Sequence, residues 1–392
     1  MFHPPPYTDL DLTTTPPTNS PLKLSDFTVG WICALEKEYI AALEVLTEEY
    51  GPSTRIASFL RTKGDRNIYT LGRIGPHNVV ILCPEARTYG LVQASGVAAD
   101  MKRSFRSIRF ILMVGVAGAA PSTKQDVRLG DVVIGTRVLP YGFGKETVDG
   151  FQGIGETLDA PHMLRSCATQ LKVAVARGLS LQREVEEMSR RSLVQDGRFE
   201  RPDMGTDRLY GVDYTHCEGC DCLSAGGKSI QRIPRHEGRL IEVHLGTVAS
   251  ADRVMKNAKM RDRLASAHDV LCFEMESAGL MGKYNCLPIR GVCDYSDSHK
   301  NDHWHDYAAA AAAVCARELL RLIEPKQTPY RGVPMFQDGM DQFMGGSFAE
   351  IERAMEGSVR FIEQLDTLHR RPATTRDGPA RQPQGPEGCP IQ

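Results

Sequence analysis

Acidic side chains stand directly after three apolar runs of the sequence, where they could act on a bound ligand. They are Glu36 and Glu38 after "FTVGWICA", Glu274 and Glu276 in "VLCFEMES", and Asp294 and Asp297 after "LPIRGVC". Short apolar runs of this kind predict buried strands, and an α/β sheet presents its ligand-binding groups beyond its strand ends. Carboxylates in that position can transfer protons or accept hydrogen bonds from sugar hydroxyls.

Four segments of the sequence, read together, resemble the nucleoside phosphorylase/nucleosidase family, in the version found at the N-terminus of fungal receptor-like proteins. The segments are "VGWICALEKE" (29–38), "LMVGVAGAA" (112–120) with "VRLGDVVIG" (127–135), "GTVASADRVM" (246–255) with "CFEMESAGL" (272–280), and "IRGVCDYSD" (289–297). Their order and spacing match the family over roughly residues 26–324. The resemblance implies an α/β three-layer sandwich around a mostly parallel mixed sheet. It also implies cleavage of the N-glycosidic bond of a purine nucleoside or related nucleotide.

The resemblance assigns a role to a carboxylate in each run. Glu276 would hold the ribose, since two carboxylate oxygens can accept both O–H donors of a cis-diol, and Met275 would pack against the sugar. Asp294 would protonate the departing purine, with Asp297 as its like-charged neighbour. Glu38 would activate water, because it matches the glutamate that has this role in the hydrolytic members of the family. These acids also suit helix caps or first helical turns, and that alternative stays open.

Small and apolar residues are expected to shape the pocket. The run "VGVAGAA" predicts a turn after a buried strand, where a nucleoside can approach the backbone closely. Its central residues are Gly115, Val116, Ala117 and Gly118. Val254 and Met255 in "ASADRVM" are candidate contacts of the base, although core packing explains them equally well.

Two positions bear on whether water or phosphate attacks the sugar. Phosphorolytic relatives often place an Arg shortly before the glycine pair and a Ser within it, whereas this chain has Met113 and Val116. Neither side chain can hold a phosphate dianion. The sequence therefore favours hydrolysis, with phosphorolysis as the alternative if Arg87 or Arg128 supplies the positive charge. A non-catalytic nucleotide-sensing or interaction domain is the alternative from a different class.

The run "HCEGCDC" is a candidate for metal binding, because a C-x-x-C pair can chelate zinc. It contains His216, Cys217, Cys220 and Cys222. No second pair follows at zinc-finger spacing, and the resemblance implies no metal. We therefore expect no metal and no cofactor, with these cysteines facing solvent.

The elements that must position the carboxylates follow from hydrophobic periodicity. Strands are expected at "FTVGWICA" (27–34), 78–83, 109–118, 131–138, 241–250, 270–274 and 287–293. Helices are expected at roughly 35–46, 90–104, 161–178, 275–284 and 304–323. Strands that alternate with helices indicate an α/β domain with a largely parallel, buried sheet.

The domain limits follow changes in composition. Residues 1–25 are rich in Pro and Thr and are expected to form a disordered N-terminal arm. The nucleoside phosphorylase-like domain is expected at 26–324, with a charged surface insertion at about 179–238. Residues 325–392 are expected to form a linker, a helix at about 347–370 and a disordered tail.

Composition and charge exclude several classes of protein. Lys plus Arg number 47 against 49 Asp plus Glu, a formal net charge of −2 that offers no basic field for nucleic acid. The sequence shows neither an uncharged apolar run long enough for a membrane span nor a signal peptide. Its cysteines lie mostly in apolar runs, as in a reducing compartment. We therefore expect an intracellular, cytoplasmic protein with a small-molecule purine ligand, and the resemblance implies a homo-oligomer.

Overall fold

The protein is described here by a computed structural model, which places residues 22–51, 64–85, 90–148, 150–216, 219, 222, 227 and 229–325. The chain divides into two units, residues 1–326 and 327–392, and all the described residues belong to the first. The predicted N-terminal arm therefore lies outside the described residues except for its last four. The predicted C-terminal linker, helix and tail lie outside them except for residue 325.

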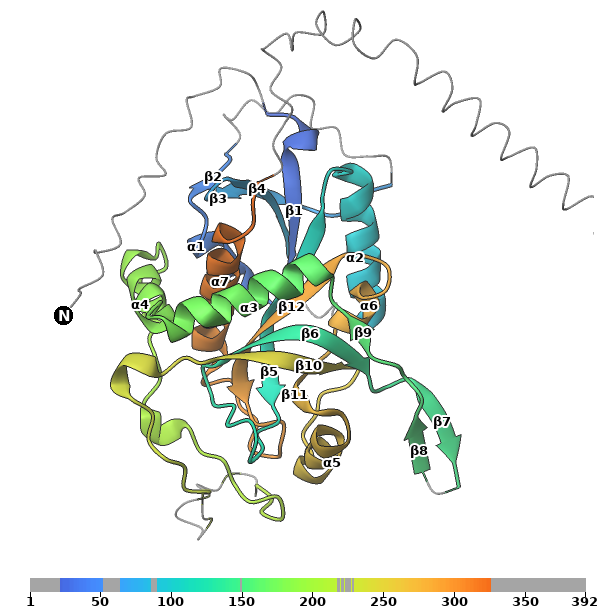
Figure 1. Ribbon diagram of the computed structural model, residues 1–392, viewed down its shortest axis with the longest axis vertical. Coiled ribbons are helices and arrows are strands. Elements are labelled where there is room, and N and C mark those ends of the chain that lie inside the picture. The colour runs from blue at the N-terminus through green and yellow to red at the C-terminus, as the bar shows by residue number, and fades with distance from the viewer. Residues whose placement is uncertain are drawn as a thin grey trace, which may run out of the picture. The chain divides into compact units, whose positions relative to one another are not determined.

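The described residues form a large mixed sheet and a small hairpin (Figure 1). Along the main sheet the strands follow the order β11-β10-β6-β12-β5-β1-β4-β3-β2, and β9 pairs with β6. The strands of the main sheet are β1 (Phe27–Ile32), β2 (Glu48–Glu49), β3 (Thr70–Ile74), β4 (His77–Leu82), β5 (Phe110–Ala119), β6 (Val132–Pro140), β9 (Leu158–Asp159), β10 (Val243–Ser250), β11 (Val270–Glu274) and β12 (Cys286–Asp294). The hairpin consists of β7 (Gly144–Thr147) and β8 (Gly150–Gly153). Most central pairs are parallel, which confirms the predicted sheet.

Helices connect these strands. They are α1 (Glu36–Glu44), α2 (Leu91–Ser104), α3 (His162–Ala176), α4 (Leu181–Arg191), α5 (Ala258–His268), α6 (Ser277–Leu280) and α7 (His305–Arg321), with short 3₁₀ turns at Leu24–Asp26, Met204–Thr206 and Glu237–Arg239. No described helix is both long and apolar enough to cross a membrane. The sequence prediction missed α4 and α5 and the short strands β2, β3, β7, β8 and β9, and α6 is shorter than the predicted helix.

Helices cover both faces of the sheet, with α2 on one side of β1 and with α1 and α7 on the other (Figure 1). A Cβ atom at Gly30 of β1 would lie 2.8 Å from Sδ of Met101 in α2, whereas one at Gly291 of β12 would meet Ala308 of α7. On β5, the residues that pair with these two glycines are an odd number of positions apart. Because successive residues of a strand point to opposite faces, the two glycines face opposite sides of the sheet. The fold is therefore the predicted three-layer α/β sandwich.

The sheet closes on itself at one end. Strand β11 pairs with β10 at the edge and also runs antiparallel to the last part of β5, where Phe273 lies opposite Gly118. Strands β5, β12, β6, β10 and β11 thereby form a ring of hydrogen-bonded neighbours. The closure brings the end of β11 to the ends of β5 and β12, although these strands are far apart in the sequence.

The segment predicted as an insertion packs closely against the sheet domain. It begins with α4, whose Leu181, Val185 and Met188 are buried and whose Glu184 carboxylate lies 2.6 Å from Arg317 of α7. Farther along, Asp207 accepts a hydrogen bond from the Tyr295 hydroxyl just after β12. The sequence predicted no strands in this segment. Among its described residues the structure has one isolated β-bridge, between Tyr210 and Ser229.

Two glycine substitutions test the packing of α7 on β12. Gly291→Ala would place a Cβ atom against the backbone of Ala308, 2.5 Å from its carbonyl carbon, so the helix must move away from the sheet. We expect a loss of roughly 1–3 kcal/mol in the free energy of unfolding, as for other overpacked cores. The matched control is Gly96→Ala, because Gly96 lies on the exposed side of α2 with open space around it. Alanine there should stabilise the protein by about 0.5–1 kcal/mol. Urea denaturation of both variants measures the difference, and equal effects would contradict the three-layer packing.

Candidate active site

A pocket with a volume of about 260 Å³ lies where the ends of β1, β5 and β12 meet β11. Its lining residues come from loops and strand ends spread over most of the domain. They are Ala34, Leu35, Glu38, Val116, Ala117, Gly118, Arg253, Val254, Met255, Phe273, Glu274, Met275, Glu276, Cys293, Asp294, Ser296, Lys300 and His305. The carboxylates that the sequence placed at separate strand ends, Glu38, Glu276 and Asp294, are therefore gathered around one cavity.

Arg290 of β12 is the buried cation of the site. Its side chain is about 1% exposed and forms an ion pair with Glu274 at the end of β11, whose side chain is equally buried. Glu276 contacts the same nitrogen more loosely, with its Oε2 3.5 Å from Nη2 of Arg290. Burial raises the pKa of Glu276, Arg290 opposes that shift, and the nearby Glu274 and Glu38 add to it.

Glu274 and Glu276 differ in what they contact. The Glu274 carboxylate accepts hydrogen bonds from the backbone N–H groups of Glu276 and Ser277 and from the Ser277 hydroxyl, at 2.8–3.2 Å. It thus caps the short helix α6 and is fully engaged. Glu276 occupies the N-cap position of α6 and makes fewer contacts, with a 3.3 Å hydrogen bond from the Met275 N–H. Its carboxylate lines the pocket and has acceptor capacity left for a ligand.

Glu38, in the first turn of α1, is held by three backbone donors. Its Oε2 accepts from the N–H groups of Ala34 and Leu35 at 2.7 and 2.9 Å, and its Oε1 accepts from Val116 at 2.8 Å. Burial raises the pKa of Glu38, although Arg290 and these hydrogen bonds oppose the shift. A carboxylate can accept about four hydrogen bonds, so Oε1 retains a site for one further donor.

Glycines of β5 make room for the carboxylates. A Cβ atom at Gly115 would lie 2.6 Å from Cδ of Glu38 and 2.7 Å from Nη1 of Arg290, and one at Gly118 would collide with Asp294 and Ser296. The prediction that residues 115–118 form a turn after the strand is wrong. They belong to β5 itself, where pairing with β12 and β11 keeps the chain extended.

Asp294, the last residue of β12, faces the pocket with a lysine beside it. Its Oδ1 accepts from the Ser296 N–H at 2.8 Å, and its Oδ2 is paired with the Lys300 ammonium and lies 3.2 Å from the Cys293 thiol. Burial alone would lower the pKa of Lys300, but Cys293 and Asp294 outweigh it and raise that pKa. The close partner of Asp294 is thus a cation.

Asp297 faces different partners from those expected of it. Its Oδ2 lies 3.8 Å from Arg261 of α5, and its Oδ1 lies 3.3 Å from Nδ1 of His299 and accepts from the His299 N–H at 2.8 Å. It does not line the pocket. Asp297 therefore has the contacts of a residue that fixes the loop after β12, and it is not the negatively charged neighbour expected in the pocket. The other negative charges of the site come from the glutamates.

Apolar side chains form one wall of the pocket, with Arg253 beside them. Phe273 of β11 packs edge-on against Tyr141, with ring centroids 5.5 Å apart, and Met255 beside it is buried. Val254 is about half exposed at the pocket, as is fitting for a ligand contact and not for core packing. Arg253 is exposed, and its guanidinium lies 4.8 Å from the Tyr141 ring centroid.

Most residues predicted for the site do line the pocket. Met275, Val254, Met255, Val116, Ala117 and Gly118 join the three carboxylates there. Gly115 is the exception, since it lies behind the cavity against Glu38 and Arg290. Sequence reasoning missed the roles of Arg290, Phe273 and Lys300. Arg290 was the detectable one, because an arginine inside an apolar strand requires a buried acid.

Among the residues that the structure describes, the phosphate ligands suggested by the sequence are not assembled at this pocket. Met113 is buried within β5, and the Val116 N–H, which could bind an anion, is occupied by Glu38. Arg128 pairs with Asp126 and the Ile233 carbonyl and does not line the pocket. Arg87 lies outside the described residues.

The pocket also contains a possible metal-binding group. Ligand atoms of Cys293, Asp294 and His305 lie within 4.8 Å of one another. The Lys300 ammonium is already paired with Asp294, and a metal cation there would be repelled by it. Proton transfer is therefore the better use of this group.

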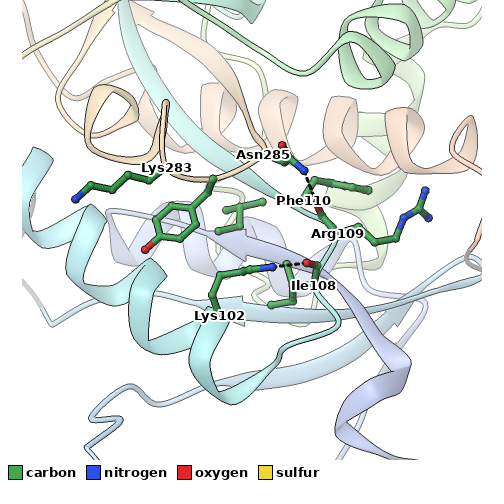
Figure 2. Close-up of a pocket in the computed structure, with 8 residues that line it drawn as sticks. Lys102, Ile108, Arg109, Phe110, Lys283 and Asn285 are labelled. Carbon is green, nitrogen blue, oxygen red and sulfur yellow. Dashed lines mark hydrogen bonds between the residues drawn. The ribbon is translucent and has the colours of Figure 1, made fainter. Parts of the chain in front are cut away.

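A second pocket, of about 170 Å³, lies where β5 and β12 begin, at the opposite end of these strands (Figure 2). Lys102 donates to the Ile108 carbonyl and Asn285 to the Arg109 carbonyl, as the dashed lines show. No carboxylate is among its described lining residues. It therefore lacks the acid and base that glycosidic cleavage requires.

Comparisons with known proteins identify relatives of this chain. The family model described as the phosphorylase superfamily matches residues 28–324. A nucleotide-binding leucine-rich repeat (NLR)-like protein of Hyaloscypha variabilis is 36% identical over 77% of this chain and 30% of its own length. The ATP nucleosidase Cap17 of Escherichia coli is 24% identical over 59% of this chain and 39% of its own length. The chain thus spans between 30% and 39% of the length of these curated relatives.

Solved structures with a similar fold include two from Helicobacter pylori. The 5'-methylthioadenosine/S-adenosyl homocysteine nucleosidase is 13% identical, with 76% of this chain and 99% of that chain covered and a TM-score of 0.48. The futalosine hydrolase is 14% identical, with the same coverage and a TM-score of 0.47.

The two buried glutamates should respond to substitution in opposite ways. Glu274→Gln leaves the buried Arg290 without its principal counter-charge, so we expect the free energy of unfolding to fall by about 3–5 kcal/mol. The raised pKa of Glu276 means that the folded protein binds this proton more tightly than the unfolded chain does. Its contribution to stability therefore falls as pH rises above the ordinary value of 4.5.

Glu276→Gln should accordingly be at least as stable as the wild type at pH 8, and the difference should vanish towards pH 4. Urea denaturation at several pH values measures both variants. A Glu276→Gln protein that is as unstable as Glu274→Gln would show that Glu276 supports the fold.

Proposed function

This chain belongs to the phosphorylase superfamily, and from that premise we propose that it hydrolyses the N-glycosidic bond of a purine nucleoside or nucleotide. The observation that carries the proposal is the meeting of Glu38, Glu276 and Asp294 around one pocket, each buried and each from a different strand end. Hydrolysis of this bond needs a grip on the sugar, a proton for the leaving base and a base for water. The three carboxylates supply one each.

Glu276 is the proposed ligand of the ribose. Its carboxylate is desolvated and keeps acceptor capacity that Glu274 lacks, so the hydroxyls of a cis-diol would satisfy it. Met275 lies next to it on the pocket wall and would pack against the sugar. This arrangement would fix the anomeric carbon between Glu38 and Asp294.

Asp294 is the proposed general acid. It would protonate the purine at N7 as the glycosidic bond breaks, because a neutral base leaves an oxocarbenium-like sugar more easily than an anion does. Lys300, paired with its other oxygen, could return a proton to it after the transfer. Phe273, Met255 and Val254 would form the apolar walls against which the base lies.

Glu38 is the proposed general base. Its three backbone donors fix the carboxylate, and the free site on Oε1 could accept a proton from water. Burial raises its pKa and so makes the carboxylate a stronger base. Because Glu38 occupies the Val116 N–H, the backbone there is not available to a phosphate dianion. This supports hydrolysis over phosphorolysis.

A nucleotide is a reasonable substrate for the same machinery. The relative from Escherichia coli is named an ATP nucleosidase, and one exposed cationic side chain, Arg253, lines the pocket beside the carboxylates. Phosphate groups favour such a partner. The NLR-like relative suggests the alternative of a domain that binds a nucleotide without cleaving it.

The deciding experiment incubates the purified chain with adenosine, inosine, guanosine, 5'-methylthioadenosine, AMP and ATP, with and without phosphate. Chromatography of the released base and sugar gives the outcome. We expect free base and free sugar at equal rates in both buffers. Accumulation of a sugar 1-phosphate would establish phosphorolysis, and saturable binding without base release would establish a sensing domain.

Substitution of the proposed acid and base should abolish base release. We expect Asp294→Asn and Glu38→Gln each to lower kcat by roughly 10²–10⁴-fold, the typical contribution of general acid or base catalysis. Circular dichroism and denaturation would confirm that both variants fold. Phe143→Ala on an exposed loop is the control and should keep full activity. Wild-type turnover by Asp294→Asn would remove Asp294 from its proposed role.

The proposed grip on the sugar makes a separate prediction. Glu276→Gln should lower kcat/KM for ribosides far more than for 2'-deoxyribosides, since only ribosides offer both hydroxyls to the carboxylate. Parallel assays of adenosine and 2'-deoxyadenosine measure the two losses. Equal losses would count against recognition of the diol.

A further inference from the structure

Three potential metal ligands meet outside the proposed active site. His216 and Cys222 come from the segment between α4 and β10, and His299 comes from the loop between β12 and α7. One ligand atom from each lies within 4.8 Å of the other two. Nδ1 of His216 is 2.9 Å from Sγ of Cys222. Two distant parts of the chain thus bring two imidazoles and a thiol together.

The spacing of these atoms suits a tetrahedral metal ion. Zinc binds cysteine sulfur at about 2.3 Å and histidine nitrogen at about 2.0–2.1 Å, which places two tetrahedral ligand atoms about 3.5 Å apart. Nδ1 of His216 and Sγ of Cys222 are 2.9 Å apart and no pair of ligand atoms is more than 4.8 Å apart, so small shifts of the side chains would reach that spacing. Cys222 is buried and His299 is largely buried, whereas His216 is exposed, so the proposed site lies at the edge of the domain with one ligand facing solvent.

The His299 ring is held by stacking, and within the part of the chain that the structure describes its two nitrogens lack a hydrogen-bond partner. Its ring stacks on Tyr210 and Tyr214, with centroids 4.1 and 5.7 Å apart. Among the described residues neither ring nitrogen makes a hydrogen bond, although Nδ1 lies 3.3 Å from Oδ1 of Asp297. Metal-bound histidines commonly have a carboxylate beside the ring nitrogen that does not bind the metal. Buried polar atoms without partners need an explanation, and a metal ion at the other nitrogen provides one.

We propose that His216, Cys222 and His299 bind a zinc ion that fastens the segment between α4 and β10 to the loop after β12. One thiolate and two imidazoles are a ligand set that zinc prefers, and a fourth position remains for water or a further side chain. The backbone N–H of His216 already donates to the Ser298 hydroxyl at 2.9 Å, which fixes the two segments at the same place. Cys217 and Cys220 lie outside the described residues, and the three ligands stand without them.

One ligand of the proposed ion lies in the loop between β12 and α7, which also carries the partner of the proposed general acid. His299 is next to Lys300, the partner of Asp294, and it contacts Asp297, which is tied to Arg261. A metal bound there would fix the loop that carries these groups. The sequence expectation of no metal was drawn from the family resemblance and from the lack of a second C-x-x-C pair at zinc-finger spacing. That criterion does not apply when the remaining ligand comes from another part of the fold.

The test measures metal content and stability, so it does not depend on the proposed hydrolysis. Protein purified with zinc present and then freed of loose metal should contain about one zinc per chain by elemental analysis. Replacement by cobalt should give the thiolate-to-cobalt charge-transfer band of a cysteine ligand. A chelator should lower the Tm of the wild type.

Two ligand variants and two controls complete the design. Cys222→Ser and His299→Asn should each lose nearly all of the zinc, and the chelator should no longer change their Tm. The controls are Cys167→Ser on α3 and His303→Asn on the exposed loop, which should retain the metal and the chelator response. If one variant does not fold, the cobalt spectrum of the wild type still decides whether a thiolate binds the metal. Wild-type protein without zinc, or equal zinc in the variants and the wild type, would overturn the proposal.

Discussion

The buried guanidinium of Arg290 is the charge on which the site depends. Three glutamates approach it from β11, α6 and α1, and an assembly of carboxylates without a cation would be prohibitively costly in a desolvated interior. Glu274 neutralises most of that charge and caps α6. Glu38 and Glu276 lie near the same guanidinium but are not tightly paired with it. Each carboxylate can therefore still accept hydrogen bonds from a ligand in the pocket. One buried ion pair thus permits two further acids to remain available to a ligand.

The backbone of β5 determines how closely these groups can approach one another. Gly115 leaves space for Glu38 and Arg290, and Gly118 leaves space for Asp294 and Ser296. Since both glycines lie within a paired strand, the surrounding hydrogen bonds hold the chain extended while the missing side chains admit the functional groups. The paired strand therefore fixes the backbone that lines one side of the pocket.

Much of the fold and part of the site could be predicted from the sequence. Apolar runs revealed the central strands, and the family resemblance of the motifs after them pointed to Glu38, Glu276 and Asp294. The fold brings these acids together because strand ends of one sheet converge. The sequence did not show which residues meet across neighbouring strands. Arg290 stands in an apolar run whose partners are set by the antiparallel closure of β11 on β5, and Lys300 reaches Asp294 only through the shape of its loop. Asp297 was expected beside Asp294 from its spacing, but the turn after β12 directs it to Arg261 and His299. Local pattern identifies an element, whereas the pairing between distant elements is a property of the whole fold.

The closure of β11 on β5 has a consequence for how the protein folds. Its pocket joins residues 34–38 to residues 293–305, so almost the entire domain must be in register before any of it exists. Contacts between such distant segments form slowly, because loop-closure entropy is lost before they contribute stability. A partly folded chain would have strands and helices but no cavity. A nucleoside bound there would therefore recognise only the completed chain, and its binding free energy would add to the stability of the native state alone.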